Sequence, residues 1–144
     1  MAISKNNLLV LKHLRENARK SFSSISRKTK IPVTTVYDNY HRLSKNQVIT
    51  KHTSLLDFKK LGFHYRSFVF VKAKKRYELL SYLKSHNNVN SIYRIGGFDY
   101  MLDTIFPTIK EHHEFLETLR DFDLLRLECH DVIDHMKKEE FLSE

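Results

Sequence analysis

Cysteine is nearly absent from this sequence, since Cys129 is the single cysteine among 144 residues. A lone cysteine excludes a framework of internal disulfides and fits a reducing compartment, so we expect a cytoplasmic protein. We interpret Cys129 as a small core residue and not as a nucleophile. Glycine and proline are also scarce, with three and two residues, which argues against linker-like or low-complexity segments.

Long apolar runs are missing as well. No run exceeds four residues, as in LLVL at positions 8–11, whereas a membrane-spanning helix needs roughly 20. The N-terminus lacks the basic, apolar and small-residue pattern of a secretory signal. We therefore expect no membrane partner. Hydrophobic residues still make up 41% of the chain, enough for one domain or for two with modest cores.

Recognisable catalytic and metal-binding motifs are missing too. The nine histidines include no His-Glu-x-x-His spacing. His112 and His113 are adjacent and would point about 100° apart on a helix, so they cannot easily share a metal. Asp99 and Asp103 could be paired carboxylates, but Asp99 lies near Gly97, where we expect it to bond backbone amides of a turn. We predict no metal, no cofactor and no catalytic residue.

Positive charge, in contrast, is abundant and concentrated in one part of the chain. The net charge is +8, yet residues 1–60 hold 13 Lys and Arg against three Asp and Glu, whereas residues 61–144 hold 12 against 14. A diffuse basic surface often serves only solubility. A surplus that is confined to one segment favours a polyanionic partner, such as double-stranded DNA.

The segment from Ser21 to Ile49 has the pattern of a helix-turn-helix that leads into a β-wing. A first helix is predicted over about 5–16, and a second begins after Ser21, which can cap it. A turn follows at 29–32 and a third helix at about 33–45. The two wing strands are predicted at 48–49 and 51–54.

The third predicted helix has two distinct faces. Val36, Tyr40 and Leu43 share one face, which we expect to pack inward. The opposite face carries hydrogen-bonding groups of a size that reaches base edges and phosphates in a major groove. With its flanking residues, it gives a predicted DNA-binding set of Ser21, Lys30, Val33, Thr34, Thr35, Tyr37, Asp38, Asn39, His41, Arg42 and Lys51. Tyr37 is equally compatible with a half-buried position.

The rest of the chain alternates strand-like and helical patterns. The predicted strands lie at 67–71, 91–95, 100–106 and 125–133, with helices at 76–86 and after Thr108. This βαββαβ order is that of a ferredoxin-like unit, whose second sheet face dimerisation can cover. We therefore predict an α+β protein with a winged helix-turn-helix domain at 1–54, a hinge at 55–65 and a dimerisation and effector domain at 66–144.

Five short motifs, in this order, resemble those of one family. They are Asn17–Ala18–Arg19 before Ser21, Thr35–Val36 with Leu43, Val48–Ile49, Leu61–Gly62, and Gly96–Gly97–Phe98–Asp99–Tyr100. The family is that of the Lrp/AsnC, or feast/famine, transcriptional regulators, and the resemblance covers nearly the whole chain. It implies a homodimer, or a tetramer or octamer, and an effector site at the Gly96, Gly97, Phe98 and Asp99 hairpin between dimers.

The chain also departs from the family pattern. Where the family usually has glycine in the helix-turn-helix turn, this chain has Lys30, which we expect near the left-handed region at a cost of about 1 kcal/mol. Family members tend to carry arginine around Asp38 and Asn39, so the preferred DNA sequence should differ. The second hairpin position is often acidic in the family and is Gly97 here, so we expect a weak or absent response to free amino acids.

The main functional hypothesis is a sequence-specific DNA-binding transcriptional regulator that acts as a dimer or higher oligomer. A low-specificity, chromosome-organising protein of the same architecture is the alternative. A tetrapyrrole decarboxylase is a rival, because some proteins that resemble this family have that activity, and His112, His113 and Arg94 could handle substrate carboxylates. A ligand-sensing module with a vestigial DNA-binding domain is a further possibility.

Overall fold

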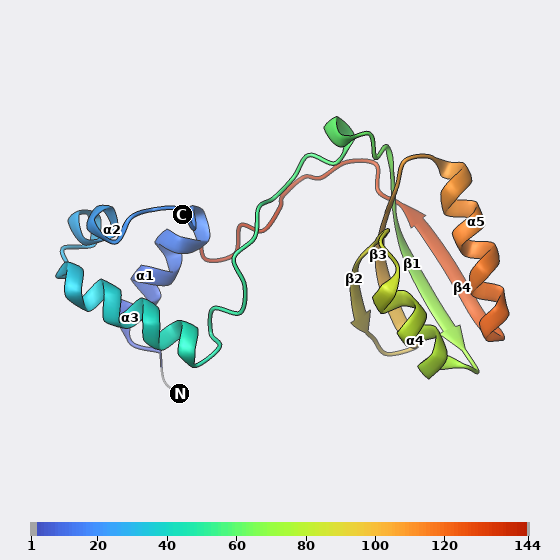
Figure 1. The fold of residues 1–144 in the computed structure, drawn as a ribbon, viewed down its shortest axis with the longest axis horizontal. Coiled ribbons are helices and arrows are strands. Elements are labelled where there is room, and N and C mark those ends of the chain that lie inside the picture. The colour runs from blue at the N-terminus through green and yellow to red at the C-terminus, as the bar shows by residue number, and fades with distance from the viewer. Residues whose placement is uncertain (1–2, 144) are drawn as a thin grey trace. The chain divides into compact units, whose positions relative to one another are not determined.

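The computed structural model describes residues 3–143. The chain divides into two compact units, one of Met1–Leu55 with Met136–Glu144 and one of Leu56–His135. The first unit contains three helices, and the second contains a four-stranded sheet with two helices (Figure 1). The C-terminal segment joins the first unit because Arg15 pairs with Glu139 at 2.5 Å and donates to the Phe141 carbonyl at 3.2 Å. The domain predicted at 66–144 had included this segment.

The helices of the first unit are α1 (Lys5–Glu16), α2 (Phe22–Thr29) and α3 (Val33–Lys45), as predicted. Serine hydroxyls cap the first two: Ser4 Oγ accepts from the Asn7 amide at 3.2 Å, and Ser21 Oγ accepts from the Ser24 amide at 3.1 Å. The three helices share one small core, made by Val10, Leu14, Ile25, Ile31 and Val36.

The wing strands predicted at 48–49 and 51–54 are not formed. Residues 46–57 are all described, and none of them is in a strand. The chain reverses at Gln47, which has a φ of 55°, and the Leu43 carbonyl then accepts from both Val48 and Ile49 at 2.9 and 3.2 Å. These bonds tie the first predicted strand to the end of α3, so its amides are not available to a hairpin partner.

The second unit confirms the predicted βαββαβ order. Its elements are β1 (Tyr65–Ala73), α4 (Arg76–Ser85), β2 (Val89–Arg94), β3 (Tyr100–Phe106), α5 (Ile109–Leu119) and β4 (Leu124–Asp131). The strands pair antiparallel in the order β2-β3-β1-β4, which is the ferredoxin-like topology. Short 3-10 turns precede β1 at Lys59–Leu61 and follow α5 at Arg120–Phe122.

Both helices of this unit pack on one face of the sheet (Figure 1). Val69, Val71 and Leu102 of the sheet are fully buried there against Leu79 of α4 and Leu119 of α5. A capping box begins α5, because Thr108 Oγ1 and Glu111 Oε2 each accept a backbone amide of the other's residue. The helical layer is therefore anchored both by apolar burial and by a defined N-terminus.

Neither helix of this unit packs on the opposite face of the sheet. The register places Phe68 and Phe70 of β1 on this open face, with Met101 of β3 beside Phe70. Asp103 lies among them, 5% exposed, and accepts from Arg66 Nε at 2.8 Å and from Asn90 Nδ2 at 2.8 Å. Asp103 is therefore part of an ion pair with Arg66 and not of a carboxylate pair.

Two expectations about single residues in this unit are wrong. Cys129 is exposed, because β4 is an edge strand that the helices do not fully cover. Asp99 does not bond the amides of its own turn. Its Oδ2 accepts from the Ala73 amide at 2.9 Å, which clamps the β2–β3 hairpin onto β1.

Candidate nucleic-acid interface

The turn between α2 and α3 is fixed by two side-chain hydroxyls of α2. Ser26 Oγ donates to the Ile31 carbonyl at 2.6 Å, and Thr29 Oγ1 accepts from the Ile31 amide at 3.3 Å while donating to the Ile25 carbonyl at 2.7 Å. Lys30 has the left-handed conformation that was predicted, with φ 60° and ψ 19°. The polar groups of the turn are thus satisfied inside the motif, and the Lys30 side chain is exposed.

The inward face of α3 is broader than its apolar residues indicate. Val36 and Leu43 are fully buried, as expected, and Tyr40 is half-buried. Asn39 is also buried, at 4% exposure, so its predicted place on the outward face is wrong. It lies three residues after Val36 and four before Leu43, which places it within the same helical arc. Its Oδ1 accepts from Arg42 Nη2 at 3.0 Å, so Asn39 can position Arg42 without touching a base.

The outward face of α3 is a narrow polar stripe. Thr34, Asp38, His41 and Arg42 are exposed, whereas Thr35 is half-buried. Val33 at 45% and Tyr37 at 51% exposure are the large side chains at the start of this surface. A stripe at this spacing lies along one side of a helix, as a helix that enters a major groove requires.

Tyr37 is held in place by aromatic neighbours and is not buried. Its ring meets Phe22 edge-on at 5.9 Å and tilts over His41 at 4.2 Å. The Tyr40 ring contacts the same Phe22 ring, with 5.1 Å between the ring centres, and the Tyr40 hydroxyl lies 3.1 Å from His52 Nε2. The aromatic contacts restrict the rotamers of Tyr37 and His41, which lowers the entropy that a contact with DNA would cost.

Basic side chains are exposed on α2, on α3 and after α3. Ser21 and Lys51, both in the predicted set, are exposed, as are Arg27 and Lys28 of α2 and Lys45 of α3, which the prediction missed. The clustering of positive charge in residues 1–60 was the signal that could have included them. Within the unit, Lys20 donates to the Glu16 carboxylate and lowers its pKa, so this acid is compensated locally. Asp38 is the single acidic residue of α3.

Replacing Lys30 with glycine is expected to separate stability from DNA binding. Glycine adopts the left-handed conformation without strain, so the free energy of unfolding should rise by up to about 1 kcal/mol. Loss of the cation should reduce the magnitude of the log–log salt slope of DNA binding by about 0.9 if Lys30 contacts a phosphate. Thermal melting and mobility-shift titrations measure the two effects. Lys30→Asn is the matched control, because it also tolerates this conformation and also removes the charge.

The four predicted effector residues lie together in the β2–β3 hairpin of the second unit. Gly96 and Gly97 are exposed, Phe98 and Asp99 are half-buried, and Gly97 has a φ of 79°. Phe98 packs against Phe70 at 5.6 Å and under the Arg126 guanidinium at 4.4 Å. Asp99 is engaged by the Ala73 amide, so the hairpin offers backbone amides, with Arg126 beside them, as its polar groups.

Two negative findings limit the chemistry of the described part of the chain. Within residues 3–143, no three His, Cys, Asp or Glu side chains gather so that they could hold a metal ion. No described helix is both long and apolar enough to cross a bilayer.

The first unit has three helices, a hydrogen-bonded turn, a polar stripe on its third helix and exposed basic side chains. These features define the class of helix-turn-helix DNA-binding proteins, here joined to a ferredoxin-like unit.

No family model matches the chain. LrpC of Bacillus subtilis, an HTH-type transcriptional regulator, is 30% identical over 125 residues, which cover 85% of this chain and 82% of LrpC. The HTH-type regulator Ptr1 of Methanocaldococcus jannaschii is 30% identical over 117 residues, 79% of each chain.

Solved structures agree on the fold. LrpC of B. subtilis superposes with a TM-score of 0.87 at 22% identity, covering 95% of this chain and 99% of LrpC. AsnC of E. coli gives a TM-score of 0.84 at 17% identity, covering 96% and 97%. A Neisseria meningitidis regulator, solved as a complex with L-methionine, gives 0.87 at 19%, covering 95% and 94%. The chain belongs to the Lrp/AsnC family and is a DNA-binding transcriptional regulator.

Proposed function

We propose that the protein binds a specific double-stranded DNA sequence as a homodimer, or as a tetramer or octamer of the same chain, with α3 of each subunit in a major groove. The observation that carries this proposal is the exposed stripe of α3 within a basic unit. Thr34, Asp38 and His41 offer the donors and acceptors that read base edges. The exposed Lys and Arg side chains are placed to neutralise phosphates, which fixes the register of the helix on the duplex.

The open face of the sheet supports the dimer. Phe68, Phe70 and Met101 are apolar, and no element of the described chain covers them. The buried Asp103 carboxylate has its partners in Arg66 and Asn90, so a second copy can cover this face without leaving that charge unpaired. A dimer would place two recognition helices about one DNA turn, roughly 34 Å, apart.

The placement of the histidines supports a function without catalysis. His112 is 2% exposed, and its Nε2 lies 2.8 Å from the hydroxyl of Ser67, which is also fully buried. Burial, and then the neighbouring His113, lower the pKa of His112, so it is neutral in the core. His112 is therefore shielded from a substrate carboxylate, which removes one of the three residues that a decarboxylase would need.

The proposal is tested by selecting bound fragments from random or genomic DNA with the purified protein, followed by footprinting. A short protected site with inverted symmetry is the expected result. Long, saturable protection without a common sequence would assign the protein to chromosome organisation instead.

Arg42→Ala is expected to lower affinity for the selected site by roughly 5- to 150-fold, the range for removing a base-reading side chain. The protein should remain folded, because the Arg42 side chain is exposed and donates to Asn39 of its own helix and not to a residue of another element. Mobility shifts on the selected site and on random DNA provide the measurement, with Arg120→Ala in the second unit as the control. Equal reductions on both DNAs would reassign Arg42 to phosphate contact.

Any effector is proposed to bind at the Gly96–Asp99 hairpin. The exposed glycines offer backbone amides to a carboxylate, but no acidic side chain stands at position 97 to pair with an ammonium.

Free amino acids should therefore leave the melting temperature of the protein unchanged in a thermal-shift screen. A bound ligand at 100 times its dissociation constant would stabilise by about 2.7 kcal/mol, so binding is easily detected. If an amino acid shifts the melting temperature and Gly96→Val abolishes this shift, the effector site is at the hairpin and the protein senses amino acids. Gly96 suits this test because a Cβ there meets no atom within 4 Å.

A further inference from the structure

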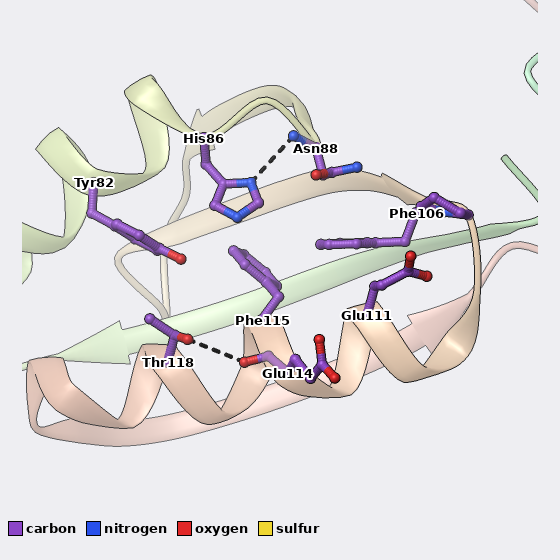
Figure 2. Close-up of a pocket in the computed structure, with 9 residues that line it drawn as sticks. Tyr82, His86, Asn88, Phe106, Glu111, Glu114, Phe115 and Thr118 are labelled. Atoms are coloured by element: carbon purple, nitrogen blue, oxygen red, sulfur yellow. Dashed lines mark hydrogen bonds between the residues drawn. The ribbon is translucent and has the colours of Figure 1, made fainter.

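The helical layer of the second unit contains a cavity of about 320 Å³ between α4 and α5, and this cavity is open to solvent (Figure 2). None of the residues that line it belongs to the helix-turn-helix, to the Gly96–Asp99 hairpin or to the open face of the sheet. Its volume is at the lower end of the range for small-molecule sites, which limits an occupant to a small ligand.

Four aromatic rings line this cavity. Phe115 lies in the middle, with His86 at 4.9 Å, Phe106 at 5.3 Å and Tyr82 at 6.5 Å from its ring centre. Figure 2 shows these rings turned toward one another from α4 and the residue after it, from β3 and from α5. Phe106 and Phe115 are each 3% exposed and are held by the core, whereas Tyr82 and His86 are half-buried. The floor of the cavity is therefore rigid and rich in π-faces.

The charged side chains that line the cavity are all acidic. Glu111 and Glu114 of α5 both line it, and no Lys or Arg does. Glu111 uses Oε2 to cap α5 at Thr108, 2.9 Å from the amide, and its Oε1 has no hydrogen bond within the described residues. Glu114 has one ion-pair partner there, Lys110, at 4.0 Å, and both side chains are largely exposed, so this pair is weak. Burial lowers the pKa of His86, which keeps that ring neutral near pH 7.

We propose that this cavity binds a small organic cation, an alkylammonium or quaternary ammonium group, with its charge over the rings and beside the two carboxylates. Cations are attracted to the negative faces of aromatic rings within about 6 Å of the ring centre. The carboxylates disfavour an anion, and a neutral ligand would lack the charge attraction that a cation gains from them. All the residues that line the cavity belong to the second unit, and none is in the DNA-reading set, so the inference goes beyond the proposed function and does not depend on it.

The test compares choline with its neutral carbon isostere, 3,3-dimethyl-1-butanol, by NMR titration of the whole protein. The two probes have nearly the same shape, so their difference reports the charge. Choline should bind roughly 3- to 30-fold more tightly, with shifts centred on Tyr82, His86 and Thr118. Equal affinity of the two probes, or no binding of choline at 10 mM, chosen as roughly tenfold above a weak 1 mM dissociation constant, would overturn the proposal.

Matched variants locate the cation. Glu114→Gln and Tyr82→Leu should each weaken choline binding by roughly 3-fold or more, while Tyr82→Phe, which keeps the ring, should bind as the parent does. Glu117→Gln on the same helix, outside the cavity, is the charge control.

Lys110→Gln should strengthen choline binding, since it removes the ammonium that competes for Glu114. Unchanged binding in both Glu114→Gln and Tyr82→Leu would overturn the assignment. So would capture of a lysine-rich peptide without any binding of free choline, which would mark a protein-docking groove.

Discussion

Raising the salt concentration from 50 to 200 mM is expected to weaken duplex DNA binding by a factor of about 10³ to 10⁵. The reason is counterion release: a dimer that makes roughly 6 to 10 phosphate contacts should show a log–log slope of about −5 to −9. The basic side chains that would make these contacts lie on α2, the turn and α3, and residues 1–60 hold 13 Lys and Arg against three Asp and Glu. Mobility-shift titrations across salt measure the slope.

Charge variants distinguish direct phosphate binding from general attraction. Lys28→Gln and Lys45→Gln should each reduce the magnitude of the slope by about 0.9 for every phosphate that the lysine had neutralised. Lys84→Gln on α4 of the second unit is the matched control and should leave the slope unchanged. A slope near zero for the parent protein would contradict a phosphate-dominated interface.

The sequence predicts the helices of the first unit well because their boundaries are set locally. Ser4 and Ser21 each accept the backbone amide that a capping residue should accept, and Lys30 has the backbone conformation that the turn demands. Thr108 caps α5 of the second unit in the same way. The βαββαβ order is also readable, since strand and helix patterns alternate along the chain. These features depend on neighbours within a few residues, so a single sequence contains them.

The features that the sequence does not predict depend on hydrogen bonds and burial that the pattern of residue types does not reveal. The predicted wing does not form because a β-strand must pair with a second strand. The amides of Val48 and Ile49 donate to the Leu43 carbonyl instead. Asn39 was placed outside because only apolar residues were counted on the inward face, although the helical arc includes it. Asp103 and Cys129 depend on which strands are central and which lie at the edge, and this order appears only when the sheet is assembled.

Phe70→Glu is expected to convert the proposed dimer or larger assembly into a monomer of 17.2 kDa. Phe70 lies on the open face of the sheet, opposite Glu128 in the register. The hydrogen bond from Arg126 lowers the pKa of Glu128, so that carboxylate is charged and a glutamate at position 70 would face it. The added charge has the same sign as that of Glu128, so covering it with a second copy is disfavoured, and each 1.4 kcal/mol weakens the dimer about tenfold. Sedimentation at micromolar concentration measures the mass.

The same variant should bind DNA more weakly although no residue of the first unit has changed. A monomer presents one recognition helix, so the gain from binding a second half-site on the same molecule disappears, a factor of about 10² to 10⁴. Tyr77→Glu is the matched control, because it adds the same charge on α4, where the side chain is 70% exposed. Circular dichroism of both variants checks that the sheet remains folded. If Phe70→Glu sediments as the parent does while Tyr77→Glu does not, the helical layer and not the open face would be the surface that joins the subunits.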